Sequence, residues 1–176
     1  MKRKDEYVIR FSELKEEKET FDFELGDSFF TVFENAEWEG GRIKATIEIQ
    51  KRPDGLTLDF FMKGNLMVAC DRCLETFPLK VKTRERLFVK YGEAEEELDA
   101  NIVTVDRDEN RIDLGPFFYE YLVLSIPVKK VHPEDESGEP GCDSSMIEKL
   151  NQHIIRENTE TIDPRWEELK KLLDKN

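Results

Sequence analysis

The sequence of 176 residues has only two histidines and three cysteines, and it contains no long apolar run. A transmembrane helix needs about 20 consecutive, mainly apolar residues, so we expect no membrane-spanning segment. The basic residues Lys2, Arg3 and Lys4 lead into Asp5-Glu6 instead of an apolar stretch, so we also expect no secretory signal peptide. Three cysteines cannot form a closed disulfide framework, which favours a cytoplasmic protein whose thiols stay reduced.

Common enzyme motifs are also missing from the sequence. It has no G-x-x-x-x-G-K-[ST] phosphate-binding loop, no G-x-G-x-x-G, no H-E-x-x-H and no G-x-S-x-G. Two histidines limit acid–base chemistry, and acidic residues are so abundant that no catalytic pair can be singled out. We therefore expect a protein that is not an enzyme.

Basic residues are outnumbered by acidic ones, with 27 Lys and Arg against 40 Asp and Glu and a net charge of −13. Such a chain is a poor general binder of polyanions, because phosphate neutralisation drives non-specific nucleic-acid affinity. The 12 Phe, 4 Tyr and 2 Trp residues nevertheless indicate a folded core. We expect residues 1–176 to form a single domain, with an acidic loop at 92–101 and an amphipathic tail helix at 157–176.

The first half of the chain alternates apolar and polar residues, which is typical of strands with one buried face. The alternation is clearest over residues 43–49, and the turn sequence 52–55 then sends the chain back into a second long strand. Gly64 interrupts this return strand and predicts a bulge. The aromatic run from Phe29 to Phe33 predicts a further strand, and a third long strand is predicted from about Leu79 to Tyr91.

Helices are predicted only in the last third of the chain. Asp113 and Pro116 predict the start of an apolar helix, and Ser145 with Glu148 predicts a capping box at the start of another. Strands followed by helices indicate an α+β fold. We expect a mainly antiparallel curved sheet or partly open barrel, with the C-terminal helices packed on it.

One face of the third long strand is predicted to be basic. Alternate residues on this face are Lys80, Lys82, Arg84, Arg86, Phe88 and Lys90. Two interpretations remain open. The face is either a solvated surface balanced by acidic neighbours such as Glu48, or a contact for phosphate or an acidic partner.

The segment Cys70-Asp71-Arg72-Cys73 lies between two predicted strands, at the tip of a hairpin. Two thiolates at this spacing are typical of a structural zinc site, which needs four ligands to be closed. The other candidate ligands are His132, Cys142 and His153. A Cys3His site would connect the hairpin tip to a distant polar loop, and its ligands would be Cys70, Cys73, His132 and Cys142. The alternatives are buried thiols without a metal and a dithiol redox pair.

Several motifs occur in a familiar order. They are the 70–75 segment (Cys-Asp-Arg-Cys-Leu-Glu), Asp113-Leu114 with Glu120, Ile126-Pro127-Val128, Val131-His132, Cys142 and Asp163-Pro164-Arg165-Trp166. In the order of these motifs, the chain resembles the YceD family over roughly residues 15–173. Members of this family are called large ribosomal RNA subunit accumulation proteins. The resemblance implies a bacterial, non-enzymatic factor needed for the accumulation or processing of large-subunit (23S) ribosomal RNA.

From this resemblance we expect large-subunit ribosomal RNA or a precursor particle to be the partner. The expected contact residues are Lys80, Lys82, Arg84, Arg86 and Lys90, while acidic loops could hold a basic ribosomal protein. The alternative is an acidic chaperone or adaptor for such a protein, without RNA contact. One structural zinc ion is the expected cofactor, and we expect neither a small-molecule substrate nor a membrane partner.

Overall fold

The computed structural model describes residues 6–33, 37–92, 101–105, 111–134, 138 and 141–153. The chain divides into two compact units, residues 1–141 and residues 142–176. The predicted tail helix at 157–176 lies outside the described residues, and so does the predicted acidic loop apart from its first and last residues. The single domain over 1–176 stays a prediction.

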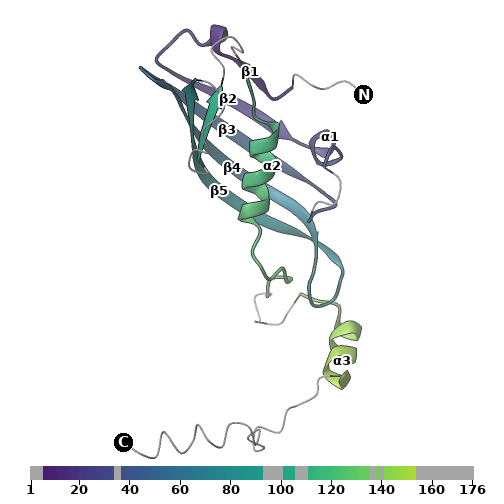
Figure 1. Cartoon of the computed structure of the whole chain (residues 1–176). Coiled ribbons are helices and arrows are strands. Elements are labelled where there is room, and N and C mark those ends of the chain that lie inside the picture. Colours follow the sequence, from purple (N-terminus) through teal and green to yellow (C-terminus); the bar gives the residue numbers. More distant parts are fainter. Residues whose placement is uncertain are drawn as a thin grey trace, which may run out of the picture. The chain divides into compact units, whose positions relative to one another are not determined.

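A five-stranded sheet forms the centre of the first unit (Figure 1). Its strands, in spatial order, are β2 (Lys18–Leu25), β3 (Gly40–Arg52), β4 (Gly55–Ala69), β5 (Thr76–Tyr91) and β6 (Ile102–Val105). The first four are antiparallel neighbours, whereas β6 pairs with β5 in parallel. Strands β1 (Val8–Arg10) and β7 (Arg111–Asp113) form a separate antiparallel pair. The α+β class and the mainly antiparallel sheet are confirmed. Within the described part of the chain the sheet is not closed, so the partly open barrel is not confirmed.

The alternating residues place one face of the sheet in the core. Buried apolar side chains on this face include Ile43, Ala45 and Ile47 of β3, Leu58, Phe60 and Met62 of β4, and Leu87 and Val89 of β5. Because side chains alternate between faces, the intervening polar residues lie on the opposite, outer face. Burial of the apolar set therefore fixes the register that the sequence pattern predicts.

The hairpin of β3 and β4 is confirmed, but the predicted bulge at Gly64 is wrong. Pairing runs without a break from Arg52 opposite Gly55 to Gly40 opposite Met67, and Gly64 lies opposite Ile43. A Cβ atom at Gly64 would lie 2.1 Å from the carbonyl oxygen of Arg42. Glycine is needed here because the two backbones approach too closely for a side chain.

The aromatic run at 29–33 does not form the predicted strand. A short helix, α1 (Asp27–Phe30), begins where the Gly26 carbonyl accepts hydrogen bonds from the N–H groups of Phe29 and Phe30. Both aromatic side chains are buried. A turn of helix can bury consecutive large residues, whereas an extended strand would direct them to opposite faces.

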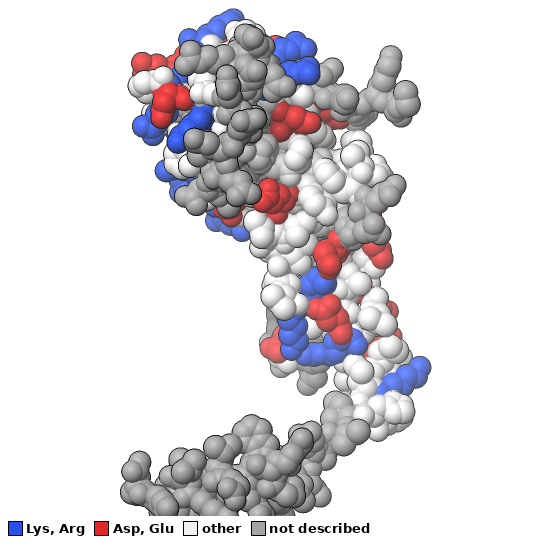
Figure 2. All heavy atoms as spheres, viewed as in Figure 1, with Lys and Arg blue, Asp and Glu red and all other residues white. Residues whose placement is uncertain are grey.

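Helix α2 (Gly115–Ser125) begins one residue later than predicted. Its N-cap is Leu114, and the Asp113 carboxylate instead accepts a hydrogen bond of 2.9 Å from the Gly115 N–H. Aromatic rings of this helix contact rings of the sheet, with Phe118 5.8 Å and Tyr121 5.0 Å from Phe60 between centroids. A 3-10 turn, η1 (Phe11–Glu13), follows β1. Figure 2, in the same view, shows mainly uncharged surface over α1, whereas Lys and Arg gather on the side of the sheet away from it.

The second unit contains helix α3 (Ser144–His153). The capping residue is Asp143 rather than Ser145, because its carboxylate accepts hydrogen bonds from the Met146 N–H (2.9 Å) and the Ser145 hydroxyl (2.6 Å). Asp is as good an N-cap as Ser, so either residue fits the sequence pattern. Among the described residues, no helix combines the length and apolar character needed to cross a membrane.

Candidate metal centre and basic sheet face

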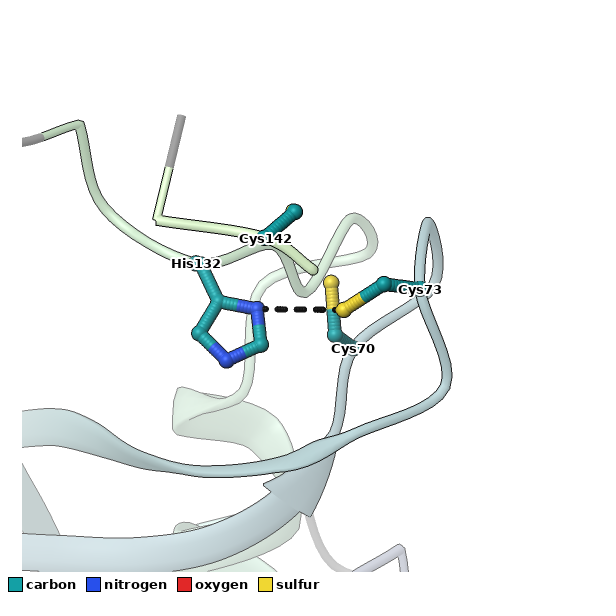
Figure 3. Close-up of side chains that lie close together, drawn as sticks. All are labelled: Cys70, Cys73, His132 and Cys142. Carbon is teal, nitrogen blue, oxygen red and sulfur yellow. Dashed lines mark hydrogen bonds between the residues drawn. The ribbon is translucent and has the colours of Figure 1, made fainter. Parts of the chain in front are cut away.

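The four predicted metal ligands lie close together in the structure (Figure 3). The ligand atoms of Cys70, Cys73, His132 and Cys142 are all within 4.8 Å of one another. In a tetrahedral zinc site with Zn–S bonds of about 2.3 Å, two sulfurs are about 3.8 Å apart. The cluster could therefore hold one metal ion after small side-chain adjustments. The other candidate, His153, is the last residue of α3 and is exposed.

The tip of the β4–β5 hairpin is a tight turn that presents both thiols. The Leu74 N–H donates to the Cys70 carbonyl at 2.9 Å, and the Cys70 N–H donates to the Glu75 carbonyl at 2.9 Å. Leu74 has a φ of 65°, a left-handed conformation that a residue with a Cβ rarely adopts, and its side chain is 71% exposed. The turn is thus held by its hydrogen bonds and not by burial of Leu74.

The surroundings of Cys70 favour the thiolate form of its side chain. Burial raises the pKa of its thiol, but hydrogen bonds from the backbone N–H groups of Cys73, Arg72 and His132 and from the His132 side chain lower it to about 6. The Arg72 N–H, for example, lies 3.4 Å from the Cys70 Sγ. Thiolate is the form of cysteine that binds metals, so this environment favours metal binding at neutral pH.

The loop that carries His132 is tied to the hairpin tip by a pair of reciprocal hydrogen bonds. The Asp71 N–H donates to the Lys130 carbonyl at 2.7 Å, and the Lys130 N–H donates to the Asp71 carboxylate at 2.6 Å. The Lys130 ammonium also lies 2.9 Å from the Glu37 carboxylate and 3.7 Å from that of Asp71. These contacts hold the loop beside the hairpin tip that carries the thiols.

Contacts with Cys73 and Phe77 help to orient the ring of His132. Its Nδ1 lies 3.4 Å from the Cys73 Sγ, and its ring centroid lies 4.5 Å from that of Phe77, a buried residue at the start of β5. The Gly141 N–H donates to the Pro133 carbonyl at 3.2 Å, so the residue before Cys142 is held beside His132. The convergence of three sulfurs and an imidazole nitrogen favours a metal site over isolated buried thiols.

The predicted basic residues of β5 share its exposed outer face. These residues are Lys80, Lys82, Arg84, Arg86 and Lys90. Arg86 makes a bidentate pair with Asp59 of β4, with N–O distances of 2.7 and 3.1 Å. For Arg86 the interpretation as a face balanced by acidic neighbours is therefore right, although the neighbour is Asp59 and not Glu48.

Sequence analysis missed the basic residues that β3 and β4 add to this face. Lys44 of β3 lies opposite Lys63 of β4, which lies opposite Lys82 of β5. Lys63 and Lys82 form no ion pair with any described residue, and Lys44 reaches only Asp22, at 4.0 Å. The turn at 52–55 sets the pairing of Lys44 with Lys63, so the sequence did contain a signal for it.

Comparison with known proteins identifies the family. A family model described as "Large ribosomal RNA subunit accumulation protein YceD" matches residues 58–173, which include the four clustered ligands and all of β5. A search of curated proteins finds no match, and a search of solved structures finds none either. Because the family model covers more than half of the 176 residues, the chain belongs to the YceD family of large ribosomal RNA subunit accumulation proteins.

Proposed function

We propose that this protein is a non-enzymatic factor that supports the accumulation or processing of large-subunit (23S) ribosomal RNA by binding RNA or a precursor particle. Membership of the YceD family is the observation that carries the proposal. The lack of common catalytic motifs in the sequence supports a binding role. The protein would act in the cytoplasm, where bacterial ribosomes are assembled.

The metal centre has a structural role in this proposal. One zinc ion would be held by Cys70, Cys73, His132 and Cys142. Protein ligands would then occupy all four tetrahedral positions and leave none for a substrate. The ion would strengthen the connection that Asp71 and Lys130 already make between the hairpin tip and the loop. It would thus keep the end of the hairpin rigid.

The outer face of β5 is the proposed contact with RNA or the particle. Lys80, Lys82 and Lys90 would meet phosphates directly and Arg84 would also contact the RNA, whereas Arg86 is engaged by Asp59. Since the whole chain has a net charge of −13, we expect the contact to weaken steeply as salt increases.

Depletion of the protein from its host tests the proposal. We expect large-subunit ribosomal RNA to fall relative to small-subunit RNA, and the normal gene to restore it. A K80E/K82E/R84E variant should restore RNA less well and sediment less with precursor particles. The matched control R10E/K15E/K129E makes the same change in net charge at residues outside strands β2–β6 and should behave as wild type. Normal RNA levels after depletion would refute the function.

Metal analysis of the purified protein tests the centre separately. We expect about one zinc ion per chain, and below about 0.1 per chain in Cys73→Ser and His132→Ala. His153→Ala is the control, because it removes an exposed histidine outside the cluster. Wild-type protein with reduced thiols and no zinc would rule the site out.

The net charge of −13 also supports the alternative of an acidic chaperone or adaptor for a basic ribosomal protein. A pull-down that retains such a protein after nuclease treatment, with no RNA crosslinked to the chain in cells, would favour this alternative.

A further inference from the structure

Three lysines lie directly opposite one another across the outer face of the sheet. Lys44, Lys63 and Lys82 occupy paired positions on β3, β4 and β5, and all three are exposed. Like charges at directly opposed positions destabilise a sheet. Among the described residues, no carboxylate pairs with Lys63 or Lys82, so this lysine row is a site of positive charge that an anion would stabilise.

An aromatic–arginine pair lies next to the lysine row. The guanidinium carbon of Arg84 is 4.7 Å from the centre of the Phe61 ring. Phe61 and Arg84 lie opposite each other, two residues along β4 and β5 from Lys63 and Lys82. Both residues and the three lysines line a hollow of about 670 Å³ on the outer face. Glu48 also lines this hollow, but its carboxylate is paired with the Lys18 ammonium at 2.8 Å. The hollow therefore combines the positive charge of Lys63 and Lys82, which no described carboxylate pairs with, with a surface on which a flat ring can stack.

A second aromatic residue lies further along the same face. Phe88 is 40% exposed and, with Arg52 and Lys90, lines a smaller hollow of about 270 Å³. At about 3.4 Å per residue, four residues along β5 place Phe88 about 14 Å from Arg84. The two aromatic positions are thus far enough apart for each to take a separate ring.

We infer that the outer face of β3, β4 and β5 binds single-stranded RNA. The lysine row would hold phosphates, the Arg84–Phe61 pair would stack on one base, and Phe88 would stack on another. This inference rests on the proposed function and specifies the form of RNA that is bound. Bases of a single strand expose their flat faces to aromatic and arginine side chains, whereas those of a duplex are stacked inside the helix. An acidic peptide would also satisfy the lysines but would leave Phe61 and Phe88 without a role.

The test measures binding of the full chain to a labelled single-stranded RNA of about 12 nucleotides and to the duplex of the same sequence. We expect the single strand to bind at least ten-fold more tightly than the duplex, by fluorescence anisotropy at low salt. K44E/K63E/K82E should weaken binding by ten-fold or more. It should also reduce the slope of log affinity against log salt by about 2, since each single-strand phosphate contact contributes about 0.7. R10E/K15E/K129E, with the same charge change elsewhere, should have a small effect on both.

Two milder variants test the stacking role. Phe61→Leu keeps an apolar side chain but removes the ring, and should weaken single-strand binding about five-fold or more without changing the salt slope. Arg84→Lys keeps the charge but loses the planar guanidinium, and should also weaken binding.

Three results would overturn the inference: equal affinity for duplex and single strand, an equal loss in the control triple variant, or competition by polyglutamate as effective as that by unlabelled RNA. The last result would identify an acidic-protein site. If depletion still lowered large-subunit RNA, any of these would refute the single-strand site but not the proposed function. Normal RNA levels in depleted cells would refute the function whatever the binding assay showed.

Discussion

Removal of the Phe118 side chain of α2 should cost a large part of the protein's stability. Its side chain is fully buried, and its ring lies 5.5 Å from Phe23, 5.8 Å from Tyr7 and 5.8 Å from Phe60 between centroids. These partners belong to β2, to the segment before β1 and to β4. One ring thus joins the helix to two strands of the sheet and to the N-terminal segment.

Replacing Phe118 by alanine should lower the free energy of unfolding by about 4 kcal/mol. Truncating a buried Phe to Ala costs about 3–5 kcal/mol, and favourable ring pairs add about 0.5–1.5 kcal/mol each beyond the buried area. Because domains of this size are stable by about 5–15 kcal/mol, the variant should lose a large part of its stability.

Urea unfolding followed by circular dichroism measures the effect. Phe117→Ala is the matched control, since Phe117 is half-buried and its ring contacts, with Phe60 at 6.5 Å and Tyr121 at 6.4 Å, are longer. We expect it to cost less than about 1.5 kcal/mol. A loss below about 1 kcal/mol for Phe118→Ala, or one no larger than for Phe117→Ala, would refute the packing of α2 on the sheet.

Three further predictions concern the hairpin and its tip. Gly64→Ala should destabilise the protein by at least about 2 kcal/mol in thermal unfolding, because its Cβ would meet a carbonyl oxygen of β3 at 2.1 Å, whereas Gly26→Ala has open space and should be nearly neutral. Asp71→Ala removes two contacts to Lys130, so hydrogen exchange of the Lys130 amide should speed up while the β3–β4 amides stay protected. Without metal, Cys70 should make stability depend on pH. Its folded pKa of about 6 lies below the roughly 8.5 of an unfolded thiol, so stability is greatest above pH 8.5 and is lost as the pH falls towards 6.

Each of these predictions has an outcome that contradicts it. Equal melting temperatures for the two glycine variants would mean that the strands can separate at Gly64 at little cost. Unchanged exchange at Lys130 would show that the loop is held by other contacts. A Cys70→Ser variant that keeps the same loss of stability between pH 8.5 and 6, in the presence of a chelator, would show that a different group titrates.

The long hairpins were predictable from sequence because alternation and turn chemistry act locally. Residues 43–49 and the turn at 52–55 suffice to define β3, the return of β4 and the outward position of Lys44. The aromatic run at 29–33 was not predictable in this way, since the pattern of a short apolar run does not by itself distinguish a strand from a turn of helix. The helix starts were misplaced for two reasons. Asp143 and Ser145 are equally good N-caps, and in α2 the Asp113 carboxylate reaches the Gly115 N–H from the position before the N-cap Leu114.

The four candidate metal ligands were predictable from the sequence, but the contacts that hold their segments together were not. Cysteine and histidine are so rare in this sequence that few combinations of four ligands exist. The contacts of Asp71 with Lys130 and of His132 with Phe77 join segments more than 50 residues apart, and no local pattern marks them. The lysine row likewise depends on the pairing of three strands and becomes visible only once their register is known.

The tight turn at residues 70–75 has a consequence for the distant lysines. Sliding β4 past β5 while keeping the same faces buried requires a shift of two residues, and such a slip must lengthen or shorten the connecting turn. Hydrogen bonds across the turn oppose that change, and a metal ion bound to both of its thiols would forbid it. The turn therefore fixes the register in which Lys63 lies opposite Lys82. The alignment of the basic face thus depends on the structure at the far end of the hairpin.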